Sequence, residues 1–205
     1  ILRQSGEIHD FVIESSLHDI GGAGIDNHGE ALPCSTLEAC READAILFGS
    51  VGGPKWENLP PKQQPERAAL LPLRKEFSLY ANLRPGNLFP ELSDLSPLRR
   101  ETVTNGIDVL CVRELTGGVY FGQPRGVETL PDGRRRAYDT QEYTDSEIQR
   151  VAALAFELAR QRGNRLTSVE KANVMETGIF WREIVTKLHA DSYSDVELDH
   201  MYADN

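Results

Sequence analysis

Cysteine is scarce in this sequence of 205 residues, which contains only Cys34, Cys40 and Cys111. Their number is odd, and no two of them are spaced as C-x-x-C. This pattern argues against a disulfide framework and against a zinc ribbon. We expect three buried free thiols in a protein of a reducing compartment.

The sequence also lacks a long apolar run and an excess of positive charge. No apolar stretch reaches the length of about 18 residues that a membrane-spanning helix needs, and no secretory signal pattern opens the chain. Asp and Glu outnumber Lys and Arg by 32 to 22, which gives a net charge of −10. An acidic surface repels phosphate backbones, so the composition argues against nucleic acid and membrane as partners. We expect a cytoplasmic protein.

Helical and strand patterns alternate along the chain, which is typical of an α/β fold. Apolar runs such as residues 45–49 and 109–112 predict strands that are buried on both faces, and buried strands of this kind favour a parallel sheet. Further strands are predicted at 11–14, 79–83, 166–169 and 196–202. Helices are predicted at 37–43, 66–77, 144–163 and 175–189, the third opened by the capping box Thr144-Asp145-Ser146-Glu147.

Residues 119–143 differ in character from the rest of the chain. Aromatic residues, glycines and a basic run lie around Pro131-Asp132-Gly133, which is a hairpin turn signal. The segment predicts a protruding β-arm. Because an isolated hairpin is only marginally stable in water, we expect the arm to pair with a second copy of itself.

Nucleotide-binding glycine motifs are weak or absent. Gly22-Ala23-Gly24 lacks the third glycine of a dinucleotide fingerprint and does not lie between a clear strand and a helix, so a simple turn is favoured. No Gly-Lys-Ser/Thr phosphate loop occurs, which leaves a kinase or an ATPase without support.

Three arginines, Arg74, Arg84 and Arg113, each lie at or near the end of an apolar element. An arginine there must find an anion, because an unpaired buried charge is unfavourable. If the three converged, their guanidinium groups would bind a di- or tricarboxylate. The alternative is that each pairs with a local Asp or Glu, and the pattern alone favours this alternative.

Tyr120 and Lys171 lie after predicted strands, at the kind of position where ligands bind in α/β folds. A partly desolvated lysine can act as a base and a tyrosine can donate a proton, although such residues are more often structural. Asp204 is a candidate ligand for a hard cation, which prefers carboxylate oxygen. One aspartate does not make a metal site, so further ligands must come from elsewhere.

Five stretches occur in an order that resembles the β-decarboxylating dehydrogenases, the isocitrate/isopropylmalate dehydrogenase family. The resemblance spans nearly the whole chain, and its strength comes from the ordered set of stretches. They are Gly-Ser-Val-Gly-Gly-Pro-Lys-Trp at 49–56, Leu-Leu-Pro-Leu-Arg-Lys at 70–75, Ala-Asn-Leu-Arg-Pro at 81–85, Val-Arg-Glu-Leu-Thr-Gly-Gly-Val-Tyr-Phe-Gly at 112–122 and Lys-Ala-Asn-Val at 171–174.

The resemblance implies a role for each candidate residue. The three arginines would bind the carboxylates of a malate moiety, and Lys171 would assist removal of the hydroxyl proton. Tyr120 would protonate the enolate that is left after CO2 departs. Asp204 would contact the substrate and ligate Mg²⁺ or Mn²⁺, and Asn173 would lie near the nicotinamide of NAD. In this family Lys171 and Asp204 serve the active site of the partner subunit, so a homodimer with shared active sites is expected.

Within the family, the chain resembles the isopropylmalate branch. The implied activity is NAD-dependent oxidative decarboxylation of (2R,3S)-3-isopropylmalate to 4-methyl-2-oxopentanoate and CO2 in leucine biosynthesis. Isocitrate enzymes place polar side chains where this chain has Leu70 and Leu71, an apolar wall that suits an isopropyl group; the alternative is that both leucines only face the core. A few methylenes discriminate by only about 1–3 kcal/mol, so enzymes of D-malate, tartrate, homoisocitrate or isocitrate, or a non-catalytic subunit, remain alternatives.

The implied architecture is a mostly parallel sheet flanked by helices, on two domains with a cleft between them. Residues 1–80 would form a partial large, cofactor-side domain, and residues 81–205 a small dimerisation domain with the arm. The opening Gly-Asp-Gly-Ile-Gly-Pro-Glu segment of the family, its two further metal aspartates and its adenosine-binding loop do not occur here. We therefore expect the chain to be truncated at both ends and inactive when isolated.

Overall fold

A computed structural model describes residues 1–205, apart from the side chain of Arg3. The chain divides into two compact units, Ile1–Phe77 and Ser78–Asn205. Helices and strands both occur, so the chain has the α/β character that was expected. The assignment of a cofactor-side domain and a dimerisation domain to residues 1–80 and 81–205 stays a prediction.

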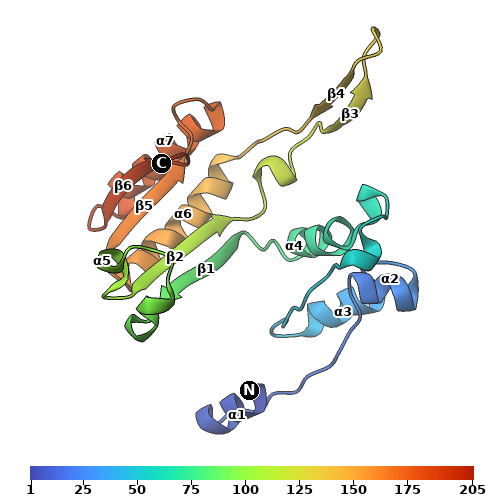
Figure 1. The fold of residues 1–205 in the computed structure, drawn as a ribbon, viewed down its shortest axis with the longest axis horizontal. Coiled ribbons are helices and arrows are strands. Elements are labelled where there is room, and N and C mark those ends of the chain that lie inside the picture. The colour runs from blue at the N-terminus through green and yellow to red at the C-terminus, as the bar shows by residue number, and fades with distance from the viewer. The chain divides into compact units, whose positions relative to one another are not determined.

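The first unit is built from short helices (Figure 1). Extended segments join them, and no strand occurs in the part of this unit that the structure describes. The helices are α1 (Leu2–His9), α2 (Gly22–His28), α3 (Cys34–Glu42), the 3-10 turns Pro54–Trp56 and Pro61–Gln63, the π-turn Glu66–Leu70 and α4 (Leu71–Glu76).

Two strand predictions in the first unit were wrong. Residues 11–14 and 45–49 form no strand, and the side chains of Val12 and Leu47 are 91% and 83% exposed. A strand is held by hydrogen bonds to a neighbouring strand, and the described residues of this unit provide no such neighbour. The apolar pattern of 45–49 was therefore not sufficient to form a buried strand.

The glycine-rich segment was also predicted incorrectly as a simple turn. Gly22 begins α2, and the helix ends at His28, before Gly29 with a positive φ of 77°. A Cβ on Gly22 would lie 2.3 Å from the ring of Trp56. The glycines therefore allow close packing of a helix here and form no dinucleotide-binding turn.

The second unit contains three pairs of strands (Figure 1). Two pairs are antiparallel: β1 (Ala81–Leu88) with β2 (Ile107–Glu114), and β3 (Gly126–Thr129) with β4 (Arg135–Tyr138). The 3-10 turn Pro90–Leu95 and α5 (Arg100–Val103) connect β1 to β2, and the 3-10 turn Gly118–Tyr120 follows β2. The predicted arm is seen in β3 and β4, a hairpin that extends away from the body of this unit.

The third pair is parallel and carries the connection that parallel strands require. β5 (Arg165–Glu170) pairs with β6 (Glu197–Tyr202), and the helix α7 (Glu176–Ser192) crosses between them. The expected mostly parallel pairing is therefore seen only in this pair. Between β1 and β2 the connection of residues 89–106 returns the chain antiparallel.

The core of the second unit lies where α6 (Asp145–Arg160) packs against α7 and the β5–β6 pair. Phe156 is fully buried, and its ring stacks on Tyr193 with centroids 4.7 Å apart. Burial of an aromatic side chain of this size stabilises the fold by roughly 1.5–3 kcal/mol. This core fixes the end of β5, where Lys171 follows.

The expected burial of the cysteines was wrong, since Cys34 and Cys111 are exposed and Cys40 is half-buried. All three are free thiols, as expected. Among the described residues, no helix combines the length and apolar character needed to cross a membrane.

The capping box at the start of α6 gives a first prediction. The Thr144 hydroxyl accepts a hydrogen bond from the Glu147 amide at 3.3 Å, and the Thr144 amide donates to the Glu147 carboxylate at 2.8 Å. Because Thr144→Ala removes the acceptor, we expect the free energy of unfolding to fall by about 1 kcal/mol in urea denaturation followed by circular dichroism. Thr144→Ser keeps the hydroxyl and should retain most of this stability; equal losses in both variants would contradict the capping role.

Candidate active site

Arg84 on β1 and Arg113 on β2 lie on one face of their strand pair. Arg113 is opposite Asn82, and Arg84 follows Asn82 by two residues, so the three side chains share that face. The Nε of Arg84 donates to the Asn82 side-chain oxygen at 2.7 Å. Neither arginine forms an ion pair with a carboxylate in the described part of the chain, so both cationic groups are available to an anionic ligand.

Tyr120 lies beside this pair of arginines. The guanidinium carbon of Arg113 is 5.3 Å from the centre of the Tyr120 ring, within the range of a cation–π contact. The tyrosine is 50% exposed, so its hydroxyl is accessible to a ligand. The structure thus brings together three of the residues that the sequence singled out.

The loop between Arg113 and Tyr120 is packed against Tyr143. Gly118 has a positive φ of 76°, and a Cβ there would lie 2.3 Å from the Tyr143 hydroxyl. Burial, reinforced by the negative charge of Glu114, raises the pKa of Tyr143. Tyr143 is therefore a neutral packing surface for the loop at physiological pH.

Lys171 and Asp204 form a second group in the same unit. The Lys171 ammonium is 2.5 Å from a carboxylate oxygen of Asp204, and the two side chains are 30% and 56% exposed. The hydrogen bond from Lys171 holds the pKa of Asp204 below its usual value of 3.8. The carboxylate therefore stays charged at neutral pH, and on acidification the pair is lost as the pH falls through that lowered pKa.

The buried carboxylate of Glu114 ends β2, directly after Arg113. Its side chain is 2% exposed and accepts hydrogen bonds from the Thr116 amide at 2.9 Å and the Gly117 amide at 2.8 Å. Arg150 of α6 lies 3.7 Å away and stacks over the ring of Tyr80 at 5.1 Å. Glu114 thereby fixes the course of the chain from Arg113 toward Tyr120.

A similar buried pair, Glu170 with Arg182 of α7, lies directly before Lys171. Neither glutamate was predicted from the sequence, and neither was its arginine partner. The signal that could have identified them was a carboxylate at the end of an apolar strand, which must find donors once it is buried. The partners could not be identified from spacing, because each pair joins distant parts of the chain.

The remaining candidates, Leu70, Leu71 and Arg74, belong to the first unit. Leu70 ends the π-turn, Leu71 begins α4, and all three side chains are half-buried. Arg74 follows Leu70 by four residues, which places the two on the same side of the helical stretch. Complete burial of the leucines in the core is therefore not observed.

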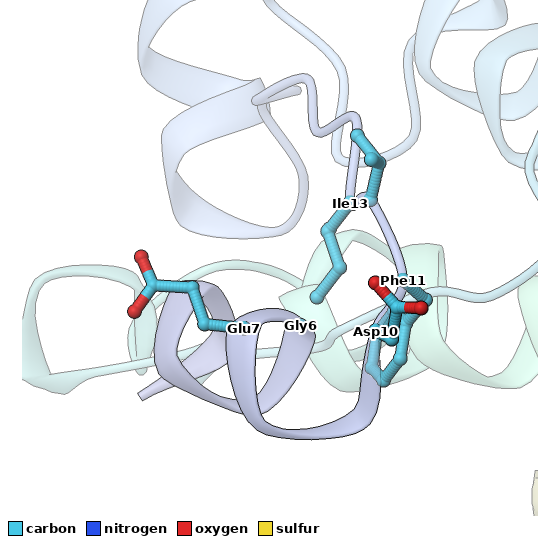
Figure 2. Close-up of a pocket in the computed structure, with 6 residues that line it drawn as sticks. Gly6, Glu7, Asp10, Phe11 and Ile13 are labelled. Carbon is cyan, nitrogen blue, oxygen red and sulfur yellow. The ribbon is translucent and has the colours of Figure 1, made fainter.

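The first unit also has a hollow at the end of α1, lined by residues 6, 7 and 10–13. Figure 2 shows the Ile13 side chain above the helix near Gly6, while the Glu7 carboxylate points away. None of the candidate residues lines this hollow.

Metal and cofactor ligands are few in this chain. No group of three or more His, Cys, Asp and Glu side chains that could hold a metal ion occurs among the described residues. Asp204 fits the role of one carboxylate donor, since Mg²⁺ accepts one or two carboxylates with water and substrate oxygens as further ligands. Asn173, which the resemblance places near the nicotinamide, is exposed two residues after Lys171.

Comparison with known sequences identifies close relatives of the whole chain. A family model described as isocitrate/isopropylmalate dehydrogenase matches residues 1–205. The chain is 58% identical over 193 residues to 3-isopropylmalate dehydrogenase of Escherichia coli, which covers 94% of the chain and 53% of that protein. It is also 58% identical to the Salmonella typhi protein of the same name over 196 residues, with coverage of 96% and 53%. The chain spans about half the length of these curated relatives.

Solved structures show the same fold. A Thermus thermophilus protein aligns with a TM-score of 0.76 at 24% identity over 99% of this chain and 38% of its own. Isocitrate dehydrogenase from Methylococcus capsulatus gives 0.69 at 24% identity over 97% and 54%. A β-decarboxylating dehydrogenase from Thermococcus kodakarensis gives 0.62 at 30% identity over 92% and 48%. The expected α/β fold class is confirmed.

Glu114→Ala tests whether the buried carboxylate holds the loop before Tyr120. The variant leaves the Thr116 and Gly117 amides without their acceptor, and we expect the free energy of unfolding to fall by about 1–3 kcal/mol. The loss should stay below that of a fully buried ion pair because the Arg150 side chain is 37% exposed. Urea denaturation measures the difference.

The matched control is Glu128→Ala, which removes an exposed carboxylate that pairs with Arg136 on the arm. Exposed pairs contribute little, so this variant should lose less than about 1 kcal/mol. Similar losses in both variants would show that burial does not increase the contribution of Glu114 to the free energy of unfolding.

Proposed function

This chain belongs to the isocitrate/isopropylmalate dehydrogenase family, and on that premise we propose that its protein oxidises and decarboxylates (2R,3S)-3-isopropylmalate with NAD⁺. The products are 4-methyl-2-oxopentanoate and CO2, a step of leucine biosynthesis in the cytoplasm. The observation that carries the proposal is the shared face of Arg84 and Arg113 beside Tyr120.

The arginines bind the substrate carboxylates. Arg84 and Arg113 have no described carboxylate as an ion-pair partner, and a guanidinium group binds a carboxylate bidentately. Arg74, in the first unit, is the third arginine that the resemblance assigns to these carboxylates. Their positive charges hold the leaving carboxylate in the orientation that decarboxylation requires.

Lys171 and Tyr120 carry the protons. When bound, NAD⁺ would accept the hydride and a divalent cation ligated in part by Asp204 would polarise the carbonyl oxygen. Lys171, once its ammonium has given up a proton to become the neutral amine, takes the proton of the substrate hydroxyl as the carbon–oxygen bond becomes a carbonyl. After the bond to the departing CO2 breaks and leaves an enolate, Tyr120 supplies a proton to the carbon.

Leu70 and Leu71 determine the substrate within the family. Both are half-buried and apolar, on the same helical stretch as Arg74. A half-buried apolar surface suits the isopropyl group and offers no partner to a third carboxylate, which would remain unpaired there. This favours isopropylmalate over isocitrate.

The arm and the Lys171–Asp204 pair support a homodimer with shared active sites. The hairpin exposes Val127 at 61% and extends away from its unit, so it has a surface free for a second copy. No hydrogen bond or ion pair in the described residues joins Lys171 and Asp204 to Arg84, Arg113 or Tyr120. Two separate groups of catalytic residues are consistent with completion of each site by the partner.

Turnover by the full-length protein with Mg²⁺ tests the reaction. NADH formation is measured with 3-isopropylmalate, D-malate and isocitrate, and we expect the highest kcat/KM for 3-isopropylmalate. Lys171→Ala removes the base and should lower kcat by about 10²- to 10⁴-fold. Preference for another substrate would overturn the role of Leu70 and Leu71, and a folded dimer without turnover on any substrate would indicate a non-catalytic subunit.

Lys187→Ala is the matched control for that experiment. Lys187 lies on α7 and forms an exposed ion pair with Asp191, so its loss removes a positive charge away from the candidate residues. Its kcat should equal that of the unsubstituted protein. An equal loss in both variants would mean that Lys171 acts through general charge and not as a base.

Val127→Asp tests the arm as a dimer contact. A charge placed on this exposed apolar position of β3 should weaken pairing with a second copy, because a carboxylate buried there would lack a partner. We expect light scattering to show a shift toward monomer on dilution. Val127→Thr keeps the side-chain shape and should remain dimeric; an unchanged mass for Val127→Asp would place the dimer contact elsewhere.

A further inference from the structure

Glu170, the last residue of β5, precedes Lys171 and is itself buried. Its side chain is 2% exposed, whereas Lys171 is 30% exposed. A buried ion pair is weak support for stability alone, because apolar residues of similar volume often replace such pairs without loss. From its contacts, we propose that Glu170, together with Arg182, is a positioning residue that fixes the turn carrying the Lys171 ammonium, an inference that rests on the proposed function.

The carboxylate of Glu170 accepts hydrogen bonds both from the turn that follows β5 and from helix α7. One oxygen accepts from the Ala172 amide at 2.5 Å, and the other accepts from Nε of Arg182 at 2.8 Å and from its Nη2. Lys171 therefore lies between Glu170 and Ala172, and the Ala172 amide is hydrogen-bonded to the Glu170 carboxylate. Both oxygens are occupied, so Glu170 is not itself available as the base.

The backbone of Glu170 links the same turn to Asp204. Its carbonyl accepts from the Ala203 amide at 2.9 Å, the residue directly before Asp204. Arg182 also stacks over the ring of Tyr202, which is opposite Glu170 in the parallel register. Glu170 thus fixes the chain on both sides of the Lys171–Asp204 pair.

Helix α7 packs against the turn that carries Lys171. A Cβ on Gly178 would lie 2.4 Å from the carbonyl carbon of Lys171, so the helix approaches that peptide more closely than any other residue type allows. The Lys171 carbonyl accepts from the amides of Val174 and Met175 at 3.2 and 2.9 Å. These contacts restrict the backbone of Lys171 on the side of α7, and the Glu170 carboxylate holds the opposite side of the turn.

Glu170→Gln tests whether both acceptor oxygens of the carboxylate are needed. Glutamine has a single acceptor oxygen, so either the Ala172 amide or the Arg182 guanidinium must face an NH2 donor. We expect amide hydrogen exchange, followed by mass spectrometry on the full-length protein, to become about tenfold faster in residues 171–175. Arg182→Lys, which loses the bidentate fork but keeps the charge, should act in the same direction and carries the test if Glu170→Gln does not fold.

Glu114→Gln is the matched control for the exchange measurement. It makes the same substitution in the other buried glutamate, which holds the Thr116 and Gly117 amides. Exchange should become faster in residues 115–118 and stay unchanged in 171–175. If neither Glu170→Gln nor Arg182→Lys altered exchange in 171–175, the positioning role would be overturned.

Turnover connects the turn to the reaction. We expect Glu170→Gln to lower kcat by about 10- to 100-fold, the effect of a misplaced catalytic group, and to leave KM within about threefold. Added to Lys171→Ala, it should cause no further loss, because a positioning residue acts only through the group that it positions. A full additional loss in the double variant would mean a general structural role and would overturn the inference.

The two proposals fail in different ways. If the full-length protein turned over no substrate, the proposed function and this inference would fall together. If Lys171→Ala left kcat unchanged, Lys171 would not be the base, and this inference would fall while the reaction itself stood. If Lys171→Ala abolished turnover while both Glu170→Gln and Arg182→Lys kept full kcat, the base would stand and only the positioning role would be lost.

Discussion

The burial of two carboxylates at strand ends, Glu114 after β2 and Glu170 after β5, is the constraint on which the second unit depends. Each side chain is 2% exposed, and a carboxylate taken out of water must be given donors. Glu114 accepts from the Thr116 and Gly117 amides and forms a longer ion pair with Arg150 at 3.7 Å. Glu170 accepts from the Ala172 amide and from Arg182. One requirement therefore fixes the end of a strand, the turn after it and the helix beside it.

Elements with a strong local signal, or with an apolar run that finds a neighbouring strand, could be predicted from the sequence, and the prediction failed where that neighbour is missing. The start of α6 follows from local chemistry, since Thr144 and Glu147 satisfy each other's amides. Strands predicted at 109–112 and 166–169 lie within the longer β2 and β5, and the strand predicted at 196–202 is β6 with one additional residue, Val196. The apolar run at 45–49 failed because its periodicity specifies burial but provides no neighbouring strand.

For the candidate site, spacing alone was a weaker guide than resemblance. Nothing in the spacing of Arg84, Arg113 and Tyr120 shows that they lie together. The antiparallel register of β1 and β2 places the two arginines on one face, and the turn after β2 brings Tyr120 to Arg113. The pattern favoured local acidic partners for the arginines, and the structure gives Arg84 an amide and Arg113 an aromatic ring. Glu114 and Glu170 could not be predicted, because each forms a buried ion pair with a residue that is distant in sequence.

Parallel pairing of β5 and β6 has a consequence for how such a site can vary among relatives. Both strands leave the pair at the same edge, so Lys171 and Asp204 meet whatever the segment between α7 and β6 contains. Insertions there would leave the two side chains together. A deletion of one residue inside either strand would turn every side chain beyond the deletion to the opposite face and separate the two. The proximity of Lys171 and Asp204 therefore depends on the register of the two strands and not on the number of residues between them.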